Sequence, residues 1–221
     1  MSYSIGPGPL TPAVRAIIYI NVGVYAVLLI LSGFVTWLGL IPELVVTRGF
    51  VWQVVTYQFV HTEVFHILFN MLWVWMFGVD LERRWGTVPF AKYYLIVGTT
   101  AGVATVVVSL LPFAWAQSSY WAVTIGASGA GYGLMLAWAI VFPHRSIYFF
   151  GIVPIPARVF ALITGAISLS MAISSGGNSN IAHVAHLAGL GAGWLYLKTP
   201  RPTFPSAPPR PPRPDYIRRV H

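Results

Sequence analysis

The sequence contains no cysteine and very little charge. Without cysteine, the 221-residue chain can form no disulfide, no thiolate metal site and no cysteine-based catalytic centre. Only 8% of its residues are charged, against about 25% in typical soluble domains. Hydrophobic residues make up 57% of the chain. A soluble domain of this length needs far more charge to cover its surface, so the composition excludes a soluble globular protein.

The few charges leave long stretches of sequence without any acidic or basic residue. These stretches run from Arg15 to Glu43, from Lys92 to Arg145 and from Arg158 to Lys198. About 20 apolar residues are enough for a helix to cross a bilayer, and some of these stretches are long enough to cross it twice. The sequence therefore predicts an all-α, multi-pass membrane protein.

Prolines, glycines and charges divide the apolar sequence into six predicted transmembrane helices. We expect them at residues 14–38, 64–83, 90–111, 128–142, 157–174 and 181–197. If six helices alternate across the membrane, the basic residues gather on one side and only Arg48 falls on the other. Because positive residues stay cytoplasmic, both termini are predicted to be cytoplasmic.

Two segments of different composition flank the predicted six-helix core, residues 14–198. Residues 1–13 lack a basic region and a small-residue cleavage site, so we expect a short N-terminal segment that is retained. Residues 199–221 are rich in Pro and Arg, which favours a disordered cytoplasmic tail that contacts anionic lipid, or alternatively a ligand for a proline-recognising domain. Much of the formal charge of +8 lies in this tail, so no nucleic-acid partner is expected.

Three predicted helices carry polar side chains where hydrocarbon makes such groups costly. The helices contain His66 and Asn70, then Ser128, and finally His183 and His186. We count residues from the cytoplasmic end of each predicted helix, at a rise of about 1.5 Å per residue. This count places His66, Asn70, Ser128 and His186 in one layer, about 6–12 Å below the outer surface of the membrane. An unpaired polar group in hydrocarbon costs several kcal/mol, so this shared layer indicates a functional site.

A serine and a histidine give this layer its predicted chemistry. Ser128 lies among small residues, between Gly126 and Gly129, and Gly189 on the last helix can pack closely against them. Close approach would bring Ser128 against His186, which can serve as its general base. No acidic residue falls in the layer on these two helices, so we expect a Ser–His dyad and no carboxylate member.

Further residues of the layer have candidate supporting roles. His66 and Asn70 are four apart on one helix face and, with the Ser128 backbone N–H, could donate to an oxyanion. Tyr132, one turn after Ser128, could stack on the imidazole. Each feature also has a simpler interpretation. The glycines could serve helix packing alone, and Asn70 could form a hydrogen bond between two helices. The histidines at 183 and 186 could bind a metal or haem. A metal would want carboxylate or thiolate ligands at that depth, and none is expected there.

Together these segments resemble the three signature segments of rhomboid intramembrane serine proteases. The matching residues are His61-x4-His66-x3-Asn70, Gly126-Ala127-Ser128-Gly129-x3-Gly133 and Ala185-His186-x2-Gly189-x3-Gly193, in the family's order. The resemblance covers the six-helix core and is closest to the minimal bacterial form. It implies a rhomboid-like bundle with Ser128 and His186 as the catalytic dyad and His66 and Asn70 at the oxyanion. It assigns supporting roles to Tyr132, His183, Gly126, Gly129 and Gly189.

The resemblance also implies the protein's substrates and location. Family members cut transmembrane proteins near the outer face of the membrane, without metal or cofactor, and a bacterial form is expected in the inner cell membrane. A non-catalytic relative that binds transmembrane helices for quality control is the first alternative, but such relatives lack the serine or the histidine. A proton-coupled carrier is the second, but carriers usually show internal repeats, and none is found in this sequence.

Overall fold

The computed structural model describes residues 6–149, 152–174 and 179–199. Its helices are α1 (Pro12–Ile30), α2 (Phe34–Leu38), α3 (Pro42–Arg48), α4 (Gln53–Thr56), η1 (Tyr57–Phe59), α5 (Val64–Trp85), α6 (Thr87–Ser109), α7 (Ala114–Ser119), α8 (Ser128–Val141), α9 (Ala157–Ser174) and α10 (Ser179–Lys198). Two strands, β1 (Ser146–Phe149) and β2 (Val153–Pro156), pair antiparallel between α8 and α9. The predicted tail lies outside the described residues from residue 200 onward, and so do residues 1–5 of the predicted N-terminal segment.

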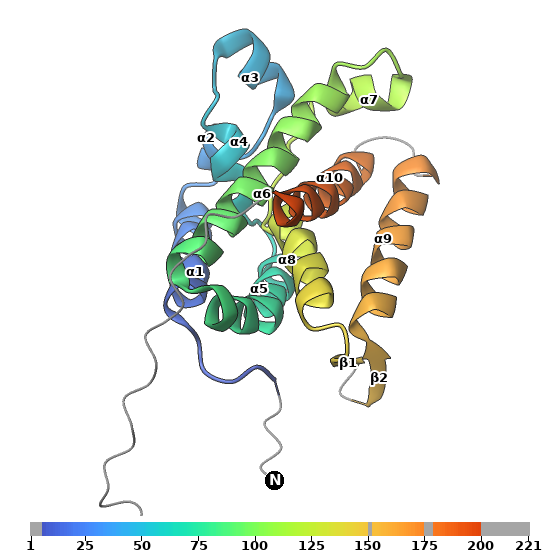
Figure 1. Ribbon diagram of the computed structural model, residues 1–221. Coiled ribbons are helices and arrows are strands. Elements are labelled where there is room, and N and C mark those ends of the chain that lie inside the picture. Colours follow the sequence, from blue (N-terminus) through green and yellow to red (C-terminus); the bar gives the residue numbers. More distant parts are fainter. Residues whose placement is uncertain (1–5, 150–151, 175–178, 200–221) are drawn as a thin grey trace, which may run out of the picture.

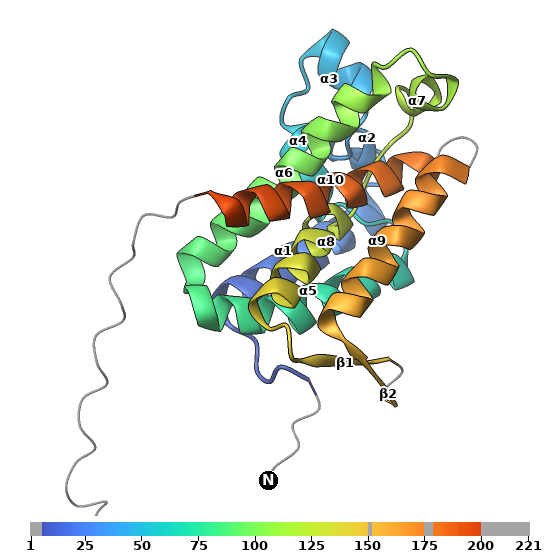
Figure 2. The same ribbon diagram turned by 45° about the vertical axis from the view of Figure 1, so that its right-hand side comes forward.

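The long helices pack into one bundle around α8 (Figure 1). Helices α5, α6, α9 and α10 all contact α8, and α1 packs on α5 and α6. Helix α9 lies at the side of the bundle, where it packs mainly on α10 (Figure 2). The short helices α2, α3, α4 and α7 gather at one end of the bundle, and the β1–β2 hairpin lies at the other end (Figure 1).

The length and surface of the helices fit a membrane protein. Within the described residues, α1, α5 and α6 are long and apolar enough to cross a bilayer, while α8 and α9 are apolar but shorter. Large apolar side chains point outward, including Phe65, Leu162 and Ile173, which are 71%, 73% and 78% exposed. Apolar surface on this scale needs an apolar surrounding, which a bilayer supplies.

The first predicted helix, residues 14–38, is broken in the structure. Helix α1 ends at Ile30 and α2 begins at Phe34, with Leu31 outside the helical region at φ −116° and ψ 61°. The break falls at Ser32 and Gly33, and serine and glycine are poorer helix formers than the apolar residues on either side. The other five predicted helices are present, with ends within three residues of those expected.

The chain is mostly helical, as predicted, but the β1–β2 hairpin between α8 and α9 is strand structure that the sequence does not predict. Its register pairs Ser146 with Pro156 and Phe149 with Val153. Proline removes a helical hydrogen bond, and isoleucine, valine and tyrosine favour extended backbone, so this segment takes up strand structure. The hairpin sets the direction in which the chain enters α9, because the Ala157 N–H donates to the Arg145 carbonyl at 3.0 Å.

Glu82, near the end of α5, joins α5 to the start of α1. Its carboxylate accepts from the backbone N–H groups of Ala13 and Val14, both at 2.9 Å, and from the hydroxyls of Thr11 and Thr87 at 2.5 and 2.9 Å. The first N–H groups of a helix have no partner within it and carry partial positive charge, so a carboxylate there stabilises the helix. Glu82 is 3% exposed, and its carboxylate oxygens accept all four of these hydrogen bonds. Its role is therefore to stabilise the contact between α1 and α5.

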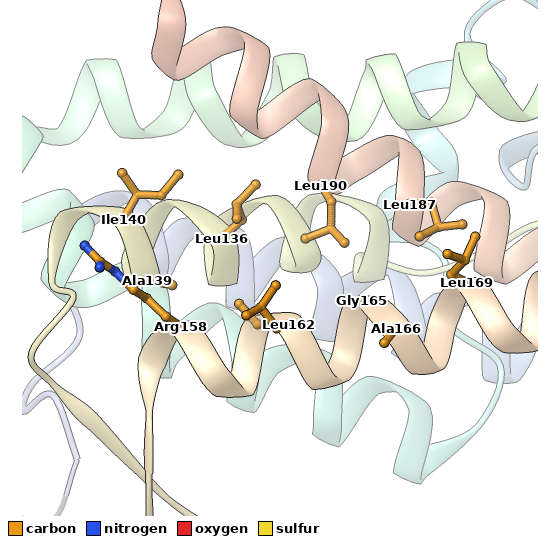
Figure 3. A pocket seen from close by; sticks show the side chains of 11 residues that line it. Leu136, Ala139, Ile140, Arg158, Leu162, Gly165, Ala166, Leu169, Leu187 and Leu190 are labelled. Carbon is orange, nitrogen blue, oxygen red and sulfur yellow. The ribbon is translucent and has the colours of Figure 1, made fainter.

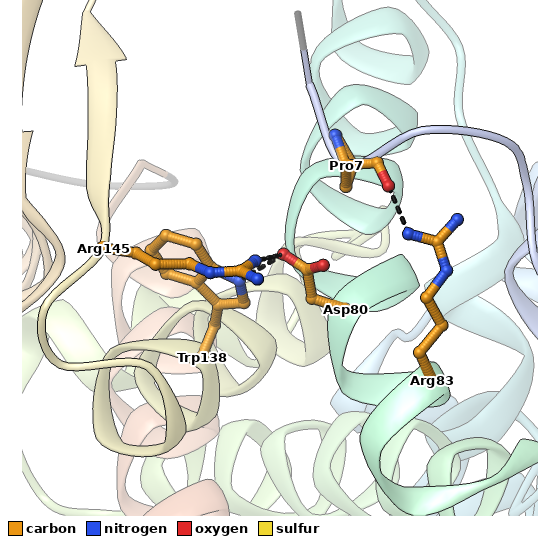
Figure 4. Close-up of polar contacts among 5 residues, drawn as sticks. All are labelled: Pro7, Asp80, Arg83, Trp138 and Arg145. Atoms are coloured by element: carbon orange, nitrogen blue, oxygen red, sulfur yellow. Dashed lines mark hydrogen bonds and ion pairs between the residues drawn. The ribbon is translucent and has the colours of Figure 1, made fainter. Parts of the chain in front are cut away.

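A second polar cluster joins α5 to the hairpin (Figure 4). Asp80 accepts from the Arg145 guanidinium and, at 3.1 Å, from the indole N–H of Trp138. Arg83, one turn along α5, donates to the Pro7 carbonyl. The start of the described chain, the end of α5 and the hairpin therefore meet at one end of the bundle.

Candidate active site

Helices α8 and α10 cross with their backbones in contact. A Cβ atom built on Gly189 would lie 2.0 Å from the carbonyl oxygen of Gly129, and one on Gly193 would lie 3.1 Å from the Cα of Gly133. Only glycine allows two helices to approach this closely. The expected close approach of these two helices is therefore present.

The crossing brings Ser128 and His186 together. Ser128 is the first residue of α8, and His186 lies midway along α10, almost one turn before Gly189. The Ser128 Oγ and His186 Nε2 atoms are 2.8 Å apart, within hydrogen-bond distance. Both side chains are half-buried, and the serine's position at the start of its helix leaves its hydroxyl beside the preceding loop.

Tyr132 and His183 surround the imidazole of His186. The Tyr132 ring stacks on it with centroids 4.2 Å apart and an angle of 11° between the planes. The His183 ring meets it edge-on, at 5.6 Å and 81°. The buried Nδ1 atom of His186 has no hydrogen-bond partner among the described residues, so ring contacts, and no carboxylate, orient this side chain.

No metal site is evident around the two histidines of α10. Over residues 6–149, 152–174 and 179–199, no group of three or more His, Asp or Glu side chains is placed to hold a metal ion. His183 meets His186 edge-on, and His186 also contacts the Tyr132 ring and the Ser128 hydroxyl.

The backbone just before Ser128 is held in an unusual conformation. Gly126 has φ +110°, which residues with a side chain rarely adopt, and its N–H donates to the Tyr57 carbonyl at 2.9 Å. The next N–H, that of Ala127, points at His61 Nε2 at 3.4 Å. Burial, together with the nearby His66, lowers the pKa of His61 to about 4, so His61 is neutral near pH 7 and can accept this bond.

His66 lies against the same segment, whereas Asn70 is turned toward its own helix. A Cβ atom on Gly126 would lie 2.6 Å from the His66 Nε2 atom, so the imidazole packs directly on this glycine. The Asn70 amide donates to the His66 carbonyl at 2.8 Å, which leaves its second N–H for another acceptor. Among the described residues, no hydrogen bond joins Asn70 to Ser128, so the candidate role of Asn70 at the oxyanion stays a prediction.

His61 is a residue of this site that carries no predicted role of its own. It is fully buried, its ring meets that of His66 at 4.9 Å, and it contacts the backbone beside Ser128. Its place in the first signature segment, five residues before His66, is the signal that could have found it. Its contacts indicate that it holds the loop in front of Ser128.

An apolar groove lies away from these residues. It measures about 700 Å³ and is bounded by α8, α9 and α10. Leu136, Leu162 and Leu190 line its middle, and Arg158 marks one end (Figure 3). None of the residues that line it belongs to the Ser128 site, and its apolar surface offers no group for acid–base chemistry.

Comparison with known proteins finds one family. The Rhomboid domain matches residues 48–201. The chain is 28% identical over 138 residues to "Rhomboid protein 1, mitochondrial" of Saccharomyces cerevisiae, covering 62% of this chain and 38% of that protein. It is 28% identical over 151 residues to "Rhomboid protease GlpG" of Yersinia pestis, covering 66% and 46%, and 28% identical over 150 residues to "Rhomboid protease GluP" of Bacillus subtilis, covering 67% and 26%. The chain thus spans less than half the length of each of these relatives.

Proposed function

This chain belongs to the rhomboid family, and on that premise we propose that it is a serine endopeptidase that cleaves transmembrane helices within the membrane. The observation that carries the proposal is the 2.8 Å contact between Ser128 Oγ and His186 Nε2. A serine hydroxyl becomes a nucleophile when an adjacent base takes its proton, and a neutral histidine at this distance is such a base.

The proposed reaction has two halves. In the first, the Ser128 oxygen attacks the peptide carbonyl carbon while its proton passes to the His186 Nε2 atom. The resulting imidazolium then gives that proton to the leaving amine, which leaves an ester on Ser128. In the second half a water molecule gives a proton to His186 and attacks the ester carbonyl carbon. His186 then returns that proton to the departing Ser128 oxygen, which releases the acid and restores the serine.

The negative charge that develops on the substrate oxygen needs donors near Ser128. We assign this role to the His66 imidazole, to the free N–H of the Asn70 amide and to the Ser128 backbone N–H. The position of His66 against Gly126 supports the assignment, since it places the ring beside the segment that leads into Ser128. Backbone N–H groups in the first turn of α8 also have no carbonyl partner within their helix.

The proposed substrate is a transmembrane helix cut near the outer face, with both termini of the enzyme cytoplasmic and six helices crossing the membrane. Arg83, Arg145 and Arg158 lie toward the hairpin end of the bundle, which supports a cytoplasmic position for that end. Ser128, at the start of α8, lies at the far end of that helix from the hairpin, and so toward the outer face. We place the protein in a bacterial cell membrane, with its Pro/Arg tail near anionic lipid.

A fluorophosphonate probe tests the proposed function directly. The Ser128 oxygen should attack the probe's phosphorus and displace fluoride, leaving a phosphonyl group that mass spectrometry locates on the Ser128 peptide. Ser128→Ala should remove the modification, while Ser146→Ala, in strand β1, should leave it unchanged. An unmodified wild-type protein, or equal modification of Ser128→Ala, would contradict a serine nucleophile and favour a helix-binding protein.

The oxyanion donors give a second prediction. His66→Ala and Asn70→Ala are each expected to lower kcat for a transmembrane substrate by about 10²–10³, the usual effect of losing one such donor. Probe labelling of Ser128 should survive in part, because the dyad remains. Phe69→Ala, at an outward-facing position of α5, serves as the control and should keep normal turnover. Unchanged kcat in both donor variants would mean that other groups hold the oxyanion.

A further inference from the structure

We propose that Ser168 on α9 is a positioning residue for the dyad, acting through Tyr132. This inference rests on the proposed function, because it concerns the base of the same reaction. Ser168 lies outside the signature segments in sequence, and its hydroxyl bonds to Tyr132. Its influence passes through one hydrogen bond and one ring stack.

Three contacts connect α9 to the nucleophile. The Ser168 hydroxyl donates to the Tyr132 phenol oxygen at 3.0 Å. The Tyr132 ring lies parallel to the His186 imidazole at 4.2 Å, and the imidazole reaches the Ser128 oxygen at 2.8 Å. The position of the α9 backbone is thereby coupled to that of the imidazole.

Ser168 is an unusual hydroxyl for its helix. It is 1% exposed, although its neighbours Ile167 and Leu169 are 52% and 51% exposed and face outward. A serine in an apolar helix commonly bonds back to a carbonyl of its own helix, as Thr164 does to Phe160 at 2.8 Å. The bond that Ser168 makes instead crosses to α8, and a buried hydroxyl bond in apolar surroundings is costly to break.

His186 depends on such support because its second ring nitrogen has none. In serine hydrolases with three catalytic residues, a carboxylate on that nitrogen fixes the ring's orientation. Among the described residues, His186 Nδ1 is buried without a partner, so the face of Tyr132 and the edge of His183 fix the ring. If the Tyr132 ring could rotate, the imidazole could rotate with it, and its Nε2 atom would move away from the Ser128 oxygen.

Tyr132 itself is restrained at two points. Its ring contacts Trp73 of α5 at 5.2 Å, with the planes at 41°, and its phenol oxygen is held by Ser168. The Trp73 contact limits the ring at its side, and among the described residues the Ser168 hydroxyl holds the phenol oxygen at the far end of the side chain. Removal of either hydroxyl of the Ser168–Tyr132 pair should therefore loosen the ring in the same way.

The test compares Ser168→Ala, Tyr132→Phe and the double variant with the wild type. Small displacements of a catalytic group lower kcat strongly, so each single variant should lose about tenfold in kcat, with KM for a transmembrane substrate within twofold of normal. The double variant should lose no more than either single variant, since both remove the same bond. Thr164→Val, which removes another α9 hydroxyl, should keep normal kcat.

Histidine proton NMR supplies a measurement that does not need turnover. The Hε1 resonance of His186, identified by its absence in His186→Asn, should lie upfield because the Tyr132 ring covers the imidazole. It should move downfield in both single variants and stay in place in Thr164→Val. Normal kcat with an unmoved resonance, or losses that multiply in the double variant, would overturn the role of Ser168. An inactive wild type in which the resonance still moves would instead overturn the proposed function alone.

Discussion

Ser128→Ala and His186→Ala are each expected to stop cleavage of a transmembrane substrate in proteoliposomes. The turnover should fall by about 10⁴ or more, because the proposed attack needs both the oxygen and the base that takes its proton. The double variant should be no slower than either single variant, since the two groups act as one unit across a 2.8 Å contact. Quantified cleavage products on gels measure all three variants.

The controls for this experiment come from the same chain. Circular dichroism and gel filtration in detergent should be unchanged, because neither replacement adds volume to the α8–α10 contact. His144→Ala, an exposed histidine beside the hairpin, should cleave normally, and His183→Ala should retain part of the activity because its ring only flanks the base. Wild-type rates in Ser128→Ala would rule out the proposed protease.

Gly189→Ala is expected to disrupt both packing and activity. The added Cβ atom would lie 2.0 Å from the Gly129 carbonyl oxygen, which is backbone and cannot turn aside, so α8 and α10 must separate. Overpacking a protein core lowers the free energy of unfolding by about 1–3 kcal/mol, occasionally more. We expect the loss in Gly189→Ala to lie at the upper end of this range, because the added atom meets backbone. Separation of the two helices also lengthens the distance between Ser128 and His186, so kcat should fall strongly as well.

Gly191→Ala is the matched control for this replacement. It lies two residues further along α10, where an added Cβ atom meets nothing within 4 Å. Alanine favours the helix over glycine, so this variant should be as stable as the wild type or slightly more stable. Thermal unfolding in detergent and the cleavage assay compare the two variants. Equal unfolding temperatures would show that the helices are not held as closely as the glycines indicate.

Much of the candidate site could be predicted because its determinants are local. Ser128 and His186 are polar groups within apolar segments, and the glycines beside them mark the faces where two helices can meet. Depth along a helix follows from counting residues, so groups on separate helices can be placed in one layer before any contact is known. The predicted stack of Tyr132 on His186 is present for the same reason.

Other features depend on residues far apart in the sequence. One N–H of the Asn70 amide donates to the His66 carbonyl of its own helix, a bond that the candidate role of Asn70 as an oxyanion donor does not predict. The loop before Ser128 is shaped by Tyr57 and His61, more than 60 residues away along the chain. Such contacts leave no periodic pattern, because only packing decides which side chain reaches which backbone group.

The sequence by itself determined the class of the protein, the apolar helices and the residue types of the site, because hydropathy and spacing act over a few turns of one helix. The tertiary structure alone decided the bond from Ser168 to Tyr132 and the contacts that Tyr57 and His61 make with the loop before Ser128. Each of these is settled by neighbours from other helices or strands, whose contacts outweigh small local preferences in free energy. A serine on an apolar helix can bond back to its own carbonyl or across to a neighbour, and only the placement of α8 beside α9 selects the second.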